Sequence, residues 1–92
     1  MTQSTMQFNN RIKSYLDFDP TKRQTQKEKV LFTLLKQKEE NIDDGWVDGL
    51  TVFSHNMFIS QYHARIWELE REGYEIESAI VEGGNWKKYR IL

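Results

Sequence analysis

The sequence predicts a small α+β domain in which three helices precede a C-terminal β-hairpin. Apolar residues first recur at helical spacing, and this run stops at Gly73. From Tyr74 onward the pattern changes to strict alternation, which Gly83-Gly84 interrupts before a second alternating run. A change of period from 3.6 to 2 at a glycine indicates a helix that leads directly into a two-stranded ribbon.

Length and composition fit one small domain. The chain has 92 residues, near the lower end of what buries a self-sufficient core, and 38% of them are hydrophobic. The absence of Cys excludes disulfides, thiolate zinc sites and thiol nucleophiles. No apolar run approaches the roughly 20 residues of a membrane span, and no secretion signal is recognisable. We therefore expect a cytoplasmic protein with no membrane partner.

Charge is distributed unevenly along the chain, although the net charge is only −1. Residues 1–40 carry eight Lys/Arg and five Asp/Glu, residues 41–82 carry two and nine, and residues 83–92 carry three and none. Any surface that faces phosphate must therefore combine the N-terminal segment with the last strand of the hairpin, around an acidic middle.

Residues 1–24 are predicted to form an N-terminal arm or short helix, and residues 25–92 the domain proper. Apolar residues of the first segment fall on one side of a helix: Phe8, Ile12, Tyr15 and Leu16. This helix would end before Asp19-Pro20, because proline disfavours helical geometry in its predecessor. The segment is either a partly frayed arm or an extra helix that docks on the core or on a second subunit, which would make a homodimer.

A capping box predicts the first helix of the domain. The side chain of Thr25 can accept from the amide of Glu28, while the Glu28 carboxylate reaches back to the Thr25 amide. The helix is expected to run to about Lys38. Its buried stripe consists of Val30, Leu31, Leu34 and Leu35.

A short strand and two further helices follow an acidic loop. Trp46-Val47 predicts the strand, and Asp48 can cap a short helix that follows it. The third helix is predicted to start at Ile59 or Ser60. It ends at Gly73, which supplies the left-handed residue of a Schellman-type stop.

The remaining residues predict a hairpin. Alternation places on one face Tyr74, Ile76, Ser78 and Ile80, with Tyr89 and Ile91 as counterparts on the return strand. Residues 82–85 provide a tight turn with the positive φ of primed hairpin turns. The order of helix, short strand, helix, helix, strand and strand is that of a winged helix-turn-helix, with an extra N-terminal helix or flexible arm.

The third helix and the start of the hairpin carry a recognisable motif, since residues 64–76 read A-R-I-W-E-L-E-R-E-G-Y-E-I. This motif resembles the pattern S-A-R-I-x-x-L-x-x-x-G-[YW]-x-I of small helix-turn-helix proteins of bacteriophages and prophages, and residues 86–92 resemble the closing strand of those proteins. One departure is Gln61-Tyr62-His63, which precedes the Ala where a small hydroxyl residue would often stand. Over roughly residues 25–92 the resemblance implies a winged domain that binds double-stranded DNA as a transcriptional or replication/recombination accessory factor.

In such a domain the third helix reads base edges in the major groove and the wing contacts the backbone. Gln61 and Arg65 are the best base-edge candidates, because Gln can pair bidentately with adenine and Arg with guanine. The further DNA-binding candidates are Ser60, His63 and Ala64 on the helix, and Lys87, Lys88 and Arg90 on the return strand. Alternatively, Arg65 pairs with Glu68, and the basic strand only discourages aggregation at a sheet edge.

A second function class is binding to a host protein through an acidic surface. Carboxylates beside the presumed recognition helix would repel phosphate but suit a basic partner: Asp43, Asp44, Asp48, Glu68, Glu72, Glu75 and Glu77. Trp67 and Trp86 are predicted to pack between helix and wing. No metal site is expected, since His55 and His63 lack further ligands at a suitable spacing. Nothing resembles a nucleophile with its base, so neither a cofactor nor enzymatic activity is expected.

Overall fold

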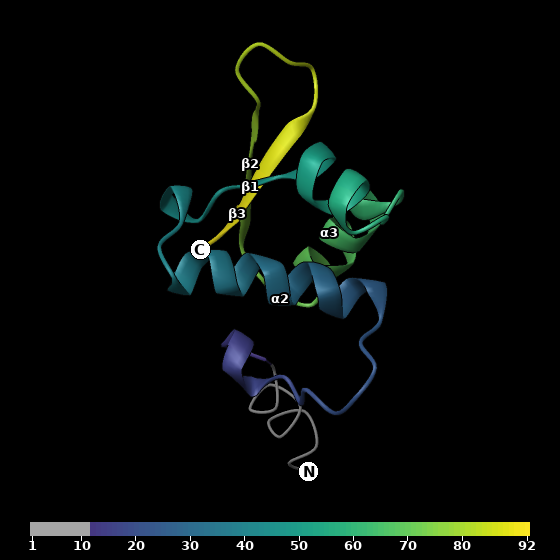
Figure 1. Cartoon of the computed structure of the whole chain (residues 1–92). Helices are drawn as coiled ribbons and strands as arrows, with labels where there is room; N and C mark the ends of the chain where they lie inside the picture. Colours follow the sequence, from purple (N-terminus) through teal and green to yellow (C-terminus); the bar gives the residue numbers. More distant parts are fainter. Residues whose placement is uncertain (1–11) are drawn as a thin grey trace.

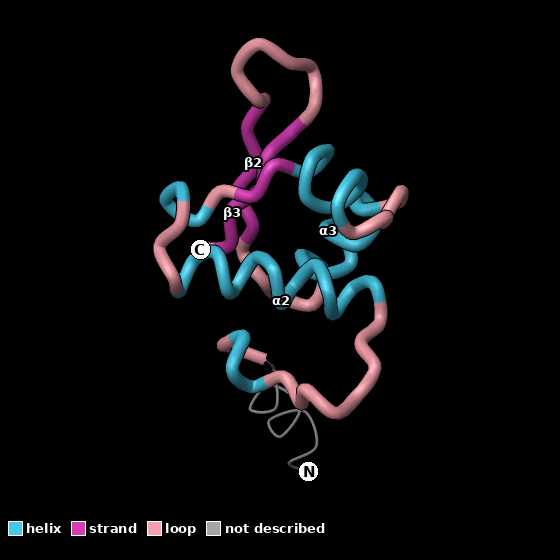
Figure 2. Tube along the Cα trace, viewed as in Figure 1, coloured by secondary structure: helices cyan, strands magenta, loops and turns pink. Residues whose placement is uncertain are grey.

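The computed structural model describes residues 12–92 as an α+β domain whose helices lie on one side of a three-stranded antiparallel sheet (Figure 1). Its elements are η1 (Tyr15–Asp17), α2 (Gln26–Glu39), η2 (Asp43–Gly45), β1 (Val47–Asp48), η3 (Gly49–Asn56), α3 (Tyr62–Arg71), β2 (Ile76–Ile80) and β3 (Lys87–Ile91). Figure 2 shows how the hairpin of β2 and β3 extends beyond the helices. This arrangement is compatible with a small winged-helix-like fold. The predicted role of Phe8 lies outside the described residues.

Helix α2 begins as the capping box predicts. The Thr25 hydroxyl accepts from the Glu28 amide at 3.2 Å, and the Thr25 amide donates to the Glu28 carboxylate at 2.8 Å. The four residues of the predicted stripe are all buried: Val30, Leu31, Leu34 and Leu35. Because a helix this short is marginal in water, its stability comes mainly from this packing.

The second helix is a π-helix whose first turn is capped by Asp48. The Asp48 carboxylate accepts from the Thr51 amide at 3.0 Å, which confirms the predicted cap. The wider spiral brings the Met57 amide to the Val52 carbonyl at 3.0 Å, five residues back. The following turn contains Phe58 in the left-handed region, with φ of 58°.

Helix α3 starts later than the prediction of Ile59 or Ser60. Ile59 is buried, but its amide donates to the Phe53 carbonyl at 2.8 Å and it belongs to the turn. Ser60 is also in the turn, and Gln61 is the N-cap residue without a side-chain capping bond. Apolar spacing shows which residues are buried, but it cannot show that one of them enters the core from a turn. The end of the helix is the predicted Schellman stop, with Gly73 at φ of 102°.

The side chains of the hairpin face the sides that were predicted, but the loop between its strands is longer than predicted. Ser78 lies opposite Tyr89, and Ile76 opposite Ile91. The loop is closed by the Val81 amide, which donates to the Trp86 carbonyl at 2.9 Å, so four residues separate the closing pair. The predicted primed two-residue geometry is therefore wrong, although Gly83 does adopt a positive φ of 80°.

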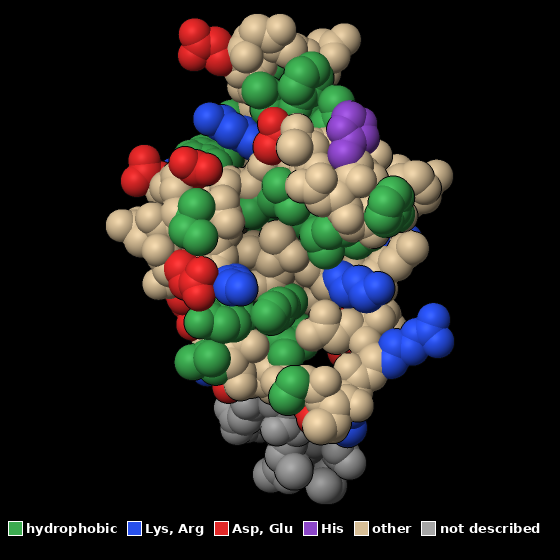
Figure 3. Space-filling view, in the orientation of Figure 1, with side chains coloured by type: hydrophobic (Ala, Val, Ile, Leu, Met, Phe, Trp, Pro, Cys, Tyr) green, Lys and Arg blue, Asp and Glu red, His purple; other side chains and the backbone are tan. Residues whose placement is uncertain are grey.

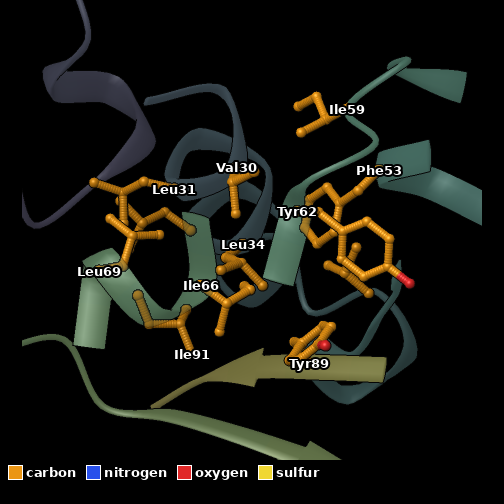
Figure 4. Packing of buried hydrophobic residues seen from close by; sticks show 12 residues of the cluster. Val30, Leu31, Leu34, Phe53, Ile59, Tyr62, Ile66, Leu69, Tyr89 and Ile91 are labelled. Carbon is orange, nitrogen blue, oxygen red and sulfur yellow. The ribbon is translucent and has the colours of Figure 1, made fainter. Parts of the chain in front are cut away.

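One hydrophobic cluster joins α2, η3 and α3 to the inner face of the sheet (Figure 4). Tyr62 lies at its centre, with its ring centroid 5.9 Å from that of Phe53 and 6.2 Å from that of Tyr89. Phe53 and Leu34 are fully buried. Since Tyr62 is the first residue of α3 and Tyr89 lies on β3, this aromatic contact sets the position of α3 against the sheet.

The segment before α2 packs along the helix as an arm, on the side away from the sheet (Figure 1). The rings of Tyr15 and Phe18 meet Phe32 edge to face, with centroids 5.6 and 5.3 Å apart. The Glu39 carboxylate accepts from the Ser14 hydroxyl at 2.6 Å and from the Tyr15 amide at 3.0 Å. Of the two predicted alternatives, the described part of the arm therefore matches docking on the core, although only a short 3₁₀ turn of it is helical.

Replacing Gly49 by Ala should destabilise the protein. A Cβ at this position would lie 2.7 Å from Cε1 of Tyr62 and 2.8 Å from the Lys87 carbonyl oxygen, and backbone atoms cannot move aside cheaply. We expect the free energy of unfolding to fall by about 1–3 kcal/mol in urea denaturation, as for other overpacked cores. The exposed neighbour Thr51→Ala is the control, and an equal loss in both variants would contradict the close approach.

The buried phenol of Tyr89 should make the free energy of unfolding fall at alkaline pH. Burial raises the pKa of its phenol from 10.0 to about 12, with a contribution from the nearby Tyr62 and Glu70. The folded state thus keeps the proton that the unfolded state has already lost, so stability present below pH 10 should be lost as pH rises through 12. Absorbance titration should show one phenolate forming near pH 12 that is absent in Tyr89→Phe. Its formation near pH 10 would contradict the burial.

Candidate functional site

The outward side of α3 is the surface that the sequence predicts to contact the base edges of DNA. Tyr62, Ile66 and Leu69 turn inward, and the opposite side of the helix exposes His63, Trp67 and Arg71. Ala64 lies on the same outward side and is half-buried.

Arg65 forms an ion pair within its own helix. Its Nε lies 3.1 Å from a carboxylate oxygen of Glu68, one turn further on. This is the ion pair that the sequence offered as the alternative. The Nε atom itself is buried and is not aligned for a hydrogen bond, so the contact is electrostatic, and the side chain is half-buried rather than extended toward solvent.

The basic residues of β3 divide between the two faces of the sheet. Tyr89 and Ile91 face the helices and are buried. Because side chains alternate along a strand, Lys88 and Arg90 lie on the outer face, away from α3. Lys87 is exposed and shares the inner face. The structure therefore brings only one of the three predicted wing cations to the side on which α3 lies.

Trp46 holds the two outer cations. The ammonium nitrogen of Lys88 lies 4.8 Å from the Trp46 ring centroid, and the guanidinium carbon of Arg90 lies 4.6 Å from it. Arg90 also forms an ion pair with Glu77 on the neighbouring strand, its Nε donating at 2.9 Å. Contacts of this kind stabilise a cation against an aromatic face. The sequence pattern gave no sign of this role of Trp46, whose ring lies on the same outer face.

Three of the seven carboxylates in the predicted acidic band form ion pairs within the chain. Glu68 pairs with Arg65, Glu72 with Lys27, and Glu77 with Arg90. The remaining carboxylates of the band are Asp43, Asp44, Asp48 and Glu75. Of these, Asp48 is occupied by hydrogen bonds. Cations therefore offset Glu68 and Glu72 beside α3, while Asp43, Asp44, Asp48 and Glu75 form no ion pair within residues 12–92.

Trp86 and Trp67 differ in their packing. The indole N–H of Trp86 donates to Asp48 at 2.9 Å, so the carboxylate that caps η3 also holds the loop end of the β2–β3 hairpin. This matches the predicted packing role for Trp86. The same prediction is wrong for Trp67, which is 56% exposed, because the helical rotation carries it to the side of α3 opposite the core.

Two aromatic side chains are thus exposed on α3 and on the turn before it. Phe58, in the turn before α3, is 83% exposed. The guanidinium of Arg71 lies over the Trp67 ring, 4.7 Å from its centroid, and makes no ion pair within residues 12–92. Apolar periodicity could not reveal Phe58, because only the backbone turn shows that it points away from the core.

The described residues offer no group of three or more His, Asp or Glu side chains arranged for a metal ion. None of the helices within residues 12–92 has the length and apolar character of a membrane span. Comparison of the chain with protein-family models, curated proteins and solved structures gives no match. The site must therefore be interpreted from its own geometry.

The Asp48 carboxylate should contribute measurably to stability, because it accepts from both the Thr51 amide and the Trp86 indole. We expect Asp48→Ala to lower the free energy of unfolding by about 1–3 kcal/mol. Asp48→Asn keeps an acceptor oxygen and should lose less. Glu82→Ala, at the exposed wing tip, serves as the control, and equal stability of all three variants would show that Asp48 does not link cap and wing.

Proposed function

We propose that this chain is a protein-binding module that docks on its partner through the outward side of α3 and the turn before it. The observation that carries the proposal is the exposure of Trp67 in the middle of that side, with Arg71 stacked on its ring. Tryptophan and arginine are the residues that most often dominate binding energy at protein interfaces.

The turn before α3 supplies a second anchor. Phe58 is exposed on a backbone held at φ of 58°, a conformation that is rare for a bulky residue and costs free energy. A small domain gains nothing in its own stability from presenting an aromatic ring in this way. Binding to a partner pocket would compensate for that cost.

Charge on this surface favours a protein partner over nucleic acid. Arg65 is neutralised by Glu68, and Lys88 and Arg90 lie on the far face of the sheet. Phosphate contacts supply most non-specific affinity for DNA, and few cations remain here to make them. The partner that fits is a surface with an apolar pocket for the indole and a carboxylate for Arg71. The predicted acidic surface would then be secondary to the aromatic anchors.

The test is affinity capture from a host-cell lysate with the wild-type chain and three variants. Trp67→Ala and Phe58→Ser should each lose the captured protein, with binding weakened by at least roughly tenfold, the loss typical of a dominant interface residue. Ile80→Ser is the matched control, since Ile80 is 58% exposed but lies on the wing. A captured protein that all variants retain equally, or no specific capture, would contradict the proposal.

DNA binding remains a second candidate function, because the positions of α3 and Lys87 favour it. The outward side of α3 exposes His63, Trp67 and Arg71, and the exposed Lys87 lies on the helix-facing side of the hairpin. Ser60, Gln61 and His63, all exposed near the start of the helix, would then contact base edges or phosphates.

Duplex DNA titration separates the two candidates. A DNA-binding function predicts affinity that falls steeply between about 50 and 200 mM salt, with a slope reduced by about one in Lys87→Ala. The protein-binding proposal predicts no such binding even at low salt.

A further inference from the structure

We infer that the free edge of β2 pairs with the β2 strand of a second copy of this chain, which joins the two sheets into one antiparallel sheet. The sheet order is β1-β3-β2, so β2 lies at an edge with β3 on one side only. This edge is separate from the outward side of α3, and the inference does not depend on the proposed function.

The backbone of β2 presents hydrogen-bonding groups along this edge. In an antiparallel pair, residues that bond to the neighbouring strand alternate with residues whose amide and carbonyl groups point the other way. The Leu92 amide donates to the Glu75 carbonyl, and the Val81 amide to the Trp86 carbonyl, both at 2.9 Å. The odd-numbered residues of this strand therefore bond to β3. The free edge is formed by the backbone groups of Ile76, Ser78 and Ile80.

The edge of β2 lacks the features that protect most edge strands, which are shortness, proline, bulges and unpaired charge. The opposite edge strand, β1, is only two residues long. In contrast, β2 has five residues in regular register with β3 and contains no proline. Its one charged residue, Glu77, forms an ion pair with Arg90. Within residues 12–92, β2 packs mainly against β3, whereas α2 lies over β3 and β1, so the edge is open to another strand.

One register makes this strand complementary to itself. A two-fold axis through Ser78 places this residue opposite its own copy and pairs Ile76 with Ile80 of the second copy. Each residue of β2 then has a partner, and the backbone groups of the two free edges bond to one another. The contact is identical for both chains, as closed two-fold symmetry requires.

Neighbouring registers are less favourable. An axis through Glu77 would place two carboxylates directly opposite each other, which destabilises a sheet. An axis through Ala79 would place the apolar Ile76 opposite the Glu82 carboxylate. Side-chain pairing thus selects the axis through Ser78.

On the helix-facing side, this register extends a row of the hydrophobic core. Ile76 lies opposite Ile91, which is buried. Ile80 lies on the same side but is 58% exposed, and Figure 3 shows that hydrophobic side chains are exposed on the hairpin beyond the helices. Pairing places Ile80 of each copy beside Ile76 of the other. The exposed side chain then continues an apolar row that already includes a core residue.

On the outer face, the same register places opposite charges across the joint. Ala79 lies opposite Lys88 on β3, and Glu77 lies opposite Arg90. Pairing brings Glu77 of the second copy beside Ala79, so this carboxylate and Lys88 are two strand spacings apart, about 9–10 Å, with only a methyl group between them. Lys88 contacts the Trp46 ring but forms no ion pair within residues 12–92. This charge complementarity favours a second copy over an unrelated strand.

Hydrogen exchange of the wild-type chain tests the pairing directly. One strand per copy makes a smaller joint than that of a stable dimer, so we expect a dissociation constant of about 10–100 µM. The amides of Ile76, Ser78 and Ile80 should therefore exchange about fourfold more slowly at about 1 mM protein than at about 20 µM. The amides of Glu77 and Ala79 bond to β3 in either state, and their exchange should not change. Equal exchange of the free-edge amides at both concentrations would overturn the inference.

Charge at the two-fold axis tests whether the partner is a second copy. Ser78 is exposed, so Ser78→Glu and Ser78→Lys should fold, but each places like charges opposite each other at the axis. Sedimentation should show a dimer weakened by roughly tenfold or more in each variant. Thr51→Glu and Thr51→Lys, at an exposed position on η3, are the matched controls and should dimerise like the wild-type chain.

A mixture of the Ser78→Glu and Ser78→Lys chains has opposite charges at the axis and should recover a heterodimer. This recovery also excludes misfolding as the reason for the loss. The inference is overturned by a wild-type chain that stays monomeric at about 1 mM, by Ser78 variants that dimerise normally, or by a mixture that recovers nothing. Protection of the free-edge amides by another protein, with the chain itself monomeric, would assign this edge to a different partner and overturn it as well.

Discussion

The alternation of side chains along β3 is the constraint on which the functional surface depends. Tyr89 and Ile91 must face the helices, because they complete the core around Tyr62. Once these two residues point inward, Lys88 and Arg90 are directed to the opposite face. The same packing that positions α3 against the sheet thus removes two basic residues from its vicinity. A wing that gripped phosphate beside α3 would need its cations at the positions that the core occupies.

Much of the fold could be predicted from local rules. The capping box at Thr25, the cap at Asp48 and the Schellman stop at Gly73 all involve residues within a few positions of one another. The facing of the hairpin followed from its alternation, and the same alternation already implied where Lys88 and Arg90 point. What misled the prediction was treating the basic strand as a single patch. The start of α3 was predicted too early, because the helical spacing of buried residues continues through the turn that contains Ile59.

The candidate site was harder to predict, because its contacts join residues far apart in the sequence. Arg65 and Glu68 are three residues apart and the pairing was foreseeable. The stacking of Lys88 and Arg90 on Trp46 joins a loop to a strand some forty residues later, and it depends on the register of β1 against β3. The exposure of Phe58 depends on one backbone angle. Counts of charged residues along the chain could not predict which charges form ion pairs with one another in the folded protein.

The placement of the two outer cations can be measured directly by NMR. If Trp46 holds Lys88 and Arg90 on the far face of the sheet, the ring current should shift their side-chain methylene protons upfield, with nuclear Overhauser contacts to the indole. These shifts should disappear in Trp46→Ala while Tyr89 keeps its contacts to Tyr62. Unshifted methylene protons on Lys88 and Arg90 in the wild-type chain, or contacts from them to residues of α3, would contradict the account.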